Sequence, residues 1–141
     1  MSRLALPNGD DHPEAAHKHL LDARVLLAQQ RPDGAAYLSG YVVECALKSL
    51  YVLEMGQALQ GHRFGALVNQ VSAVATAAGA KSAKYFGAAT TGVLGSAIGS
   101  WAPEMRYRAP SLALGDAQTW HNYAWDVFQE TVHQMRLDGV L

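Results

Sequence analysis

Four side chains in the segment from residue 37 to residue 48 carry groups that can take part in chemistry. They follow one another at intervals of four, three and four positions: Tyr37, Tyr41, Glu44 and Lys48. An α-helix turns by about 100° per residue, so these intervals place all four on one narrow stripe. The other positions of the segment are almost all apolar, which is typical of a helix at the centre of a bundle. We therefore expect the stripe to face a specific partner rather than open water.

Two interpretations of Glu44 follow from this pattern. In the first, Glu44 and Lys48 form an exposed ion pair one helical turn apart, which contributes only about 0.3–0.5 kcal/mol. In the second, Glu44 is partly buried and needs a cation, because an unpaired buried charge is costly. Lys48 is one candidate for that cation and Arg106 is the other. The planar fork of an arginine suits a carboxylate better, so the simplest prediction makes Glu44 a structural anchor for Arg106.

A second group of chemical side chains lies in the segment SWAPEMRYRAPSLALG, residues 100–115. Two prolines stiffen it, and Arg106 and Arg108 flank Tyr107. Such a cluster can hold a phosphate and stack on a nucleic-acid base. The alternative is structural: Trp101 and Tyr107 plug the end of the bundle while Arg106 neutralises Glu44. Arg108 has no obvious internal acid as a partner, so the functional prediction rests mainly on Arg108, Tyr107 and Lys48.

The histidines and the cysteine do not form a recognisable catalytic or metal-binding pattern. His17 and His19 lie about 200° apart on a helix, so they cannot share a metal ion from one face. His62 follows Gly61 at a predicted helix start, where a neutral imidazole can cap the helix or bond to the loop. Cys45 adjoins Glu44 on the apolar helix and reads as a small core thiol. We predict no metal site and no cofactor.

The elements that must position these groups are all helical. The predicted helices are joined by short links and run over about 12–30, from an Asp33 cap to about Met55, 61–78, 82–99, and from Asp116 to 138. Four glycines weaken the fourth of them. Asp11 can cap the first helix, and Gly56 stops the second. The predicted inward face of the last helix consists of Trp120, Ala124, Val127, Thr131 and Met135. Residues 1–10 are predicted to be a flexible tail and residues 11–141 a single domain. This order indicates an all-α fold, an up-and-down bundle of four or five helices.

Composition narrows the classes of function. The chain has 141 residues, of which 50% are hydrophobic and 16% charged, and its formal net charge is −1. No global positive field exists to attract nucleic acid, so any anion binding must come from a local patch. A lone cysteine and an N-terminus without an apolar core predict a cytoplasmic protein that is neither secreted nor in a membrane.

Taken in order, the motifs resemble those of the HEPN family of small helical-bundle domains. They are the aromatic-rich AAYLSGYVVECALKSLYVLEMG with Glu44 and Leu47-Lys48, then Gly61-His62, then WAPEMRY at 101–107. The resemblance spans about residues 12–135. It implies a helical bundle that often dimerises and acts near nucleotides or RNA. It also implies a setting in toxin–antitoxin or defence modules, where many such domains are toxins or partners of small nucleotidyltransferases.

Catalytic members of this family are metal-independent RNases that use an arginine followed, after four to six residues, by a histidine. None of the six histidines here follows an arginine at that spacing. The resemblance therefore does not extend to RNase activity at this motif.

Three functions remain open at this stage. The first is a non-catalytic nucleotide- or RNA-binding module that uses Arg106, Tyr107, Arg108, Lys48 and Tyr41. In it, Glu44, Arg106, His62 and Trp101 form a structural polar anchor. The second is a homodimeric protein-interaction subunit with no ligand of its own. The third is an RNase whose catalytic residues are displaced from the family's positions.

Overall fold

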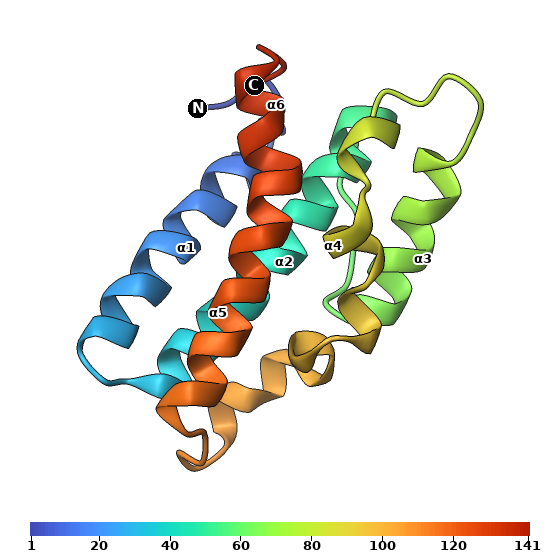
Figure 1. The fold of residues 1–141 in the computed structure, drawn as a ribbon. Coiled ribbons are helices and arrows are strands. Elements are labelled where there is room, and N and C mark those ends of the chain that lie inside the picture. Colours follow the sequence, from blue (N-terminus) through green and yellow to red (C-terminus); the bar gives the residue numbers. More distant parts are fainter.

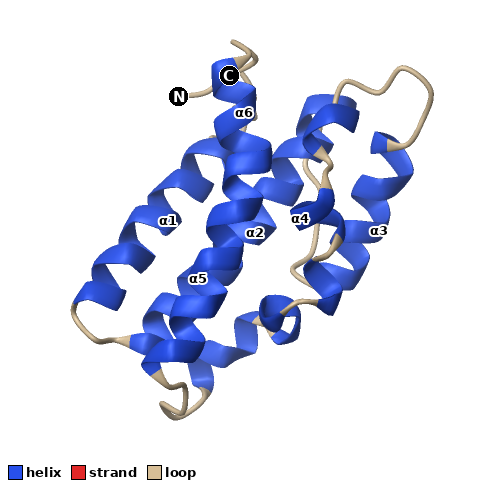
Figure 2. Ribbon diagram, viewed as in Figure 1, coloured by secondary structure: helices blue, strands red, loops and turns tan.

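Helix α2, Pro32–Met55, is the central element of the protein (Figure 1). A computed structural model describes residues 1–141, and it contains helices and turns but no strand (Figure 2). The prediction of an all-α helical bundle is confirmed. The other α-helices are α1 (His12–Ala28), α3 (Phe64–Ala75), α4 (Ala88–Thr91), α5 (Leu114–Phe128) and α6 (Gln134–Leu137).

The apolar sequence of α2 explains its central place. Helices α1, α3 and α5 all pack against it, so apolar side chains are buried around most of its circumference. The fully buried ones include Val42, Val43, Ala46, Leu47 and Leu50. Because this core surrounds α2, any polar group on the helix must find a partner inside the protein.

The start of α2 differs from the prediction. Arg31 is the N-cap and makes no side-chain capping bond, and Pro32 occupies the first turn. Asp33 lies inside the helix, where its carboxylate accepts hydrogen bonds from the backbone N–H groups of Ser111 (3.0 Å) and Leu112 (3.3 Å). Asp33 thus ties the far end of the 100–115 segment to α2 instead of capping the helix. At the other end Gly56 stops α2 as expected, with φ of 67°.

The first ten residues make specific contacts with the bundle, although the sequence predicts a flexible tail. Ser2 is buried, and both its backbone N–H (2.6 Å) and its hydroxyl (2.8 Å) donate to Asp11. Asp11 also caps α1 through the backbone N–H of Glu14, as predicted. Arg3 donates to the carbonyl of Gly139 at 3.0 Å. The N-terminal segment therefore joins the start of α1 to the C-terminus.

Residues 82–99 do not form the single helix that was predicted. They fold into short 3₁₀ turns around α4, which has only four residues, and α3 is likewise shorter than expected. The carboxylate of Glu130, which follows α5, accepts hydrogen bonds from the backbone N–H groups of Ala89 and Thr90 and from the Thr90 hydroxyl. Gly87 leaves room for this carboxylate, because a Cβ there would overlap it. A tertiary contact thus satisfies backbone groups in a segment that glycines make a poor helix.

The last helical rod runs from α5 through a π-helical turn, Gln129–His133, into α6. It begins at Leu114, so Asp116 lies in its first turn rather than at its cap. The predicted inward face is confirmed, since all its members are buried: Trp120, Ala124, Val127, Thr131 and Met135. No helix of the protein combines the length and the apolar character that crossing a bilayer requires.

Candidate functional site

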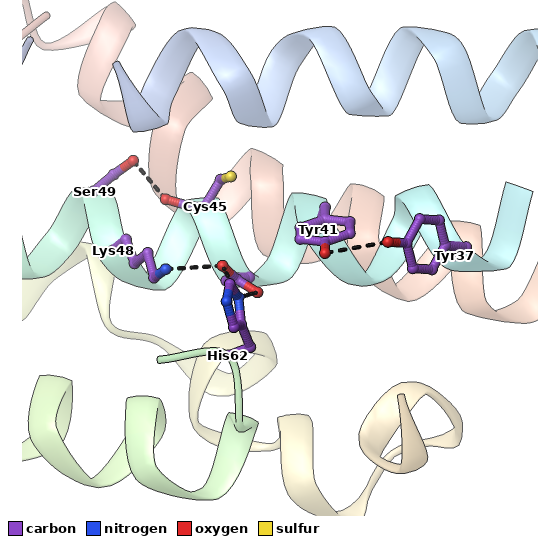
Figure 3. A network of polar contacts seen from close by, with 7 residues as sticks. Tyr37, Tyr41, Cys45, Lys48, Ser49 and His62 are labelled. Atoms are coloured by element: carbon purple, nitrogen blue, oxygen red, sulfur yellow. Dashed lines mark hydrogen bonds and ion pairs between the residues drawn. The ribbon is translucent and has the colours of Figure 1, made fainter. Parts of the chain in front are cut away.

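The carboxylate of Glu44 is the centre of a buried polar network on α2 (Figure 3). Its residue is only 3% exposed, and it accepts a hydrogen bond from Lys48 Nζ at 2.8 Å. The Nδ1 atom of His62 lies 3.0 Å from each of the two carboxylate oxygens. The interpretation of Glu44 as a buried, paired acid is therefore the one that the structure supports. The interpretation of Glu44 and Lys48 as an exposed ion pair is wrong, and so is the prediction that Glu44 pairs with Arg106.

His62 reaches Glu44 from the loop before α3, not from the first turn of a helix. Gly61 has φ of 92°, a conformation that side chains other than glycine rarely adopt, and it directs the chain toward α2. A carboxylate accepts hydrogen bonds, so the proton of a neutral His62 sits on Nδ1 and leaves Nε2 as an acceptor. The side chain is 54% exposed. The sequence analysis did not predict that His62 pairs with Glu44. The only feature of the sequence that pointed to a role for His62 was the dipeptide Gly61-His62.

Two tyrosines form a separate hydrogen-bonded pair on the same stripe, toward the start of α2. The hydroxyl of Tyr37 donates to that of Tyr41 at 3.2 Å, and the rings meet edge to face. Burial, followed by the bond from Tyr37, raises the pKa of Tyr41 to about 12. Tyr41 is therefore a neutral phenol at physiological pH and cannot serve as a base. The ring of His19 from α1 packs on its other side.

Trp101 fixes the 100–115 segment against α2. It is 4% exposed, its indole N–H donates to the carbonyl of Tyr37 at 3.0 Å, and its ring stacks on Phe64. Gly40 permits this close approach, because a Cβ at that position would overlap the indole ring. Trp101 is thus buried against the bundle, as the structural interpretation of the 100–115 segment predicts. Its position determines where the residues that follow it lie.

A salt bridge joins the loop of His62 to the turn that carries the arginines. Arg63 donates to Glu104 at 2.8 Å, and Glu104 belongs to the 3₁₀ turn η4, Pro103–Tyr107. Together with the stack of Trp101 on Phe64, this contact holds the two loops side by side. His62 and η4 therefore share one face of the molecule.

Arg106 lies over the ring of Tyr107, with 4.8 Å between its guanidinium carbon and the ring centre. The phenols of Tyr107 and Tyr37 raise the pKa of Arg106, and the guanidinium forms no ion pair with Glu44. Tyr107 is 77% exposed, so it does not plug the bundle. Arg108 is exposed as well, and neither arginine has a carboxylate within ion-pair distance.

The predicted site residues fall into two groups. One lies along the polar stripe and consists of Tyr41 and of the connected residues Glu44, Lys48 and His62, in which Lys48 is 8% exposed and already paired. Lys48 therefore has no free charge for a ligand, and its predicted binding role is corrected to a structural one. The other group is an exposed cluster of Arg106, Tyr107 and Arg108, which lines neither of the two main surface cavities.

The remaining titratable groups near the stripe come from α1. His12 and His19 are half-buried, and burial lowers the pKa of both; for His12 the charge of Lys48 lowers it further. No three or more His, Cys, Asp or Glu side chains gather in a way that could hold a metal ion.

Cys45 lies in the core beside this network, and burial raises the pKa of its thiol to about 12. We expect iodoacetamide to alkylate it in the native protein about a thousand times more slowly than in the urea-unfolded chain, since only the thiolate reacts. Mass spectrometry of timed samples measures both rates without a mutation, because Cys45 is the only cysteine. Equal rates would place the thiol at the surface.

Comparisons with models of protein families, with curated proteins and with solved structures give no match for this chain. The relation to HEPN domains is therefore a resemblance that the ordered motifs alone carry.

Proposed function

We propose that this chain is a HEPN-like module that binds a nucleotide or single-stranded RNA through Arg106, Tyr107 and Arg108. In this proposal the arginines hold phosphate groups and the ring of Tyr107 stacks on a base. The observation that carries it is an exposed tyrosine between two arginines that no carboxylate neutralises. The motif resemblance adds the proposed setting: a homodimer that works with a small nucleotidyltransferase in a toxin–antitoxin or defence system.

The cluster is supported on both sides, which favours binding at low entropic cost. Trp101 is docked on α2 before the cluster, and Asp33 holds the backbone of Ser111 and Leu112 after it. Stacking of one base on an aromatic ring contributes about 1–3 kcal/mol and tolerates any base. Because the net charge of the chain is −1, this local patch rather than the whole surface must attract the phosphates.

A specific observation also favours a second candidate function, cleavage of RNA. His62 is held by a buried carboxylate through Nδ1, so its Nε2 can take the proton of a ribose 2′-hydroxyl. The 2′-oxygen then forms a bond to phosphorus and the 5′-oxygen leaves, taking its proton from His62, while Arg106 on the adjoining loop stabilises the charge that develops on the phosphoryl oxygens. Loss of cleavage in His62→Gln and resistance of a 2′-deoxy substrate would distinguish this reaction from simple binding.

Removing both arginines tests the binding proposal. We expect Arg106→Gln/Arg108→Gln to weaken binding of a fluorescein-labelled decanucleotide RNA, measured by polarisation. The slope of log affinity against log salt should fall by about 1.4, or about 0.7 for each lost phosphate contact on a single strand. Tyr107→Leu should weaken binding without changing the slope, because it removes stacking rather than charge.

Lys81→Gln is the control, since this exposed lysine belongs to the loop between α3 and α4. That loop lies at the opposite end of the bundle from the segment that precedes α5 (Figure 1). It should leave affinity and slope unchanged. If the double arginine variant binds as tightly as the wild type, the cluster is not the RNA site. A stable dimer that binds no RNA or nucleotide would instead favour the protein-interaction alternative.

A further inference from the structure

A surface cavity of about 510 Å³ lies between the C-terminal half of α1 and α5. It shares no residue with the proposed RNA site. Its walls come from one face of each helix: Arg24 and Leu27 on α1, and Leu114, Gln118 and Trp125 on α5. Its volume is typical of a site for a small molecule.

The cavity contains a cation that no acid neutralises. The guanidinium of Arg24 lies 5.2 Å from the centre of the Trp125 ring, and Arg24 forms no salt bridge. This cation–π contact uses none of the guanidinium N–H groups as hydrogen-bond donors to a carboxylate, so they are free to bind one. A carboxylate can accept two of them at once, which is the pairing that this geometry suits best.

The polar groups beside Arg24 retain hydrogen-bonding atoms that no other group uses. His121 lines the cavity, is 6% exposed, and its Nδ1 atom is buried without a hydrogen bond. Burial, and then the charge of Arg24, lower the pKa of His121. Arg24 is therefore the cation of this cavity at neutral pH. Gln118 donates its amide N–H to the Asn122 carbonyl oxygen at 2.8 Å. That bond leaves the Asn122 N–H₂ group as a donor and the Gln118 oxygen as an acceptor.

The apolar part of the cavity is aromatic and aliphatic. Trp125 is 38% exposed and Leu114 is 43% exposed, so both present surface that a ligand can cover. Leu27 lines the opposite wall, on α1. A flat ring between these side chains removes apolar surface from water, while a charged group on that ring reaches Arg24.

From these contacts we propose that the α1–α5 cavity binds a small aromatic carboxylate. The carboxylate pairs with Arg24 and accepts from the amide of Asn122, and the ring packs along Trp125. A donor on the ring, such as an indole N–H, bonds to the oxygen of Gln118. This site is independent of the proposed RNA site, so either proposal can fail without the other.

Isothermal titration calorimetry of the full chain with indole-3-acetate tests this proposal. The matched neutral probe is indole-3-acetamide, which has the same ring but no charge. We expect the acid to bind with a dissociation constant of about 1 mM or tighter and the amide at least tenfold more weakly. Arg24→Gln should weaken binding of the acid at least tenfold, and Trp125→Leu should weaken both probes.

Arg31→Gln is the control, because it removes one exposed arginine near α1 that does not line this cavity. It should leave the affinity for indole-3-acetate unchanged. Circular dichroism of each variant checks that the helical content is retained. The proposal is overturned if the acid gives no heat at millimolar concentrations, if acid and amide bind equally, or if Arg24→Gln binds as the wild type does.

Discussion

Glu44→Ala is expected to lower the free energy of unfolding by about 3–5 kcal/mol. The substitution leaves the ammonium group of Lys48 unpaired, because Lys48 is 8% exposed and Glu44 is the only acid with which it forms a salt bridge. It also removes the carboxylate to which the His62 ring is hydrogen-bonded. Urea unfolding followed by circular dichroism measures the change. If the slope of the unfolding free energy against urea concentration is the same as in the wild type, the shift in midpoint reports a loss of stability.

A double variant separates the stranded charge from simple loss of packing. Glu44→Leu/Lys48→Met removes both charges and keeps similar volumes, so it should regain most of the lost stability. Lys48→Met alone should also be strongly destabilising, because it leaves the carboxylate with His62 as its only partner. If the double variant is as unstable as Glu44→Ala, the cost does not come from an unpaired charge and this account of the network is wrong.

The second large effect is expected at Gly40, where the added methyl group of Gly40→Ala would overlap the indole of Trp101. The indole must then leave its position, losing the stack on Phe64 and the hydrogen bond to the carbonyl of Tyr37. We expect a loss of about 3–5 kcal/mol, comparable to truncating a buried tryptophan. Because Trp101 positions η4, the variant should also weaken RNA binding through Arg106.

A double-mutant cycle tests whether the two residues act together. Trp101→Ala alone should cost about as much as Gly40→Ala. In the combined variant the methyl group of residue 40 has no ring to meet, so the two losses should not add. Additive losses of stability would mean that Gly40 matters for a reason other than room for the indole.

The long helices follow from the sequence because their signals are local. Apolar spacing and the breaker at Gly56 bound α2 to within a residue or two, and the inward face of α5 was predicted residue by residue. The segment 82–99 could not be predicted in the same way. Its glycines make helix and turns similar in energy, and the choice depends on Glu130, about forty residues further along the chain.

The tertiary structure determines which cation pairs with Glu44. Sequence reasoning favours Arg106 because its fork matches a carboxylate, but Trp101 docks on the carbonyl of Tyr37. Tyr37 lies seven residues before Glu44, about 10 Å along the helix at 1.5 Å per residue. Arg106 is held near that end of the stripe by the same loop. The better fit of a guanidinium to a carboxylate therefore has no effect here, because the packing of Trp101 keeps Arg106 away from Glu44.

The sequence by itself determined that the chain is an all-helical bundle with α2 at its centre, and that Glu44, if buried, needs a cation. These follow from periodicity and from the cost of burying charge, both of which depend on residue types alone. Tertiary structure alone decided that Lys48 and His62 supply the partners, and that Arg106, Tyr107 and Arg108 stay exposed. The physical reason is that loop positions depend on a few long-range contacts, here Gly40 with Trp101 and Trp101 with Phe64.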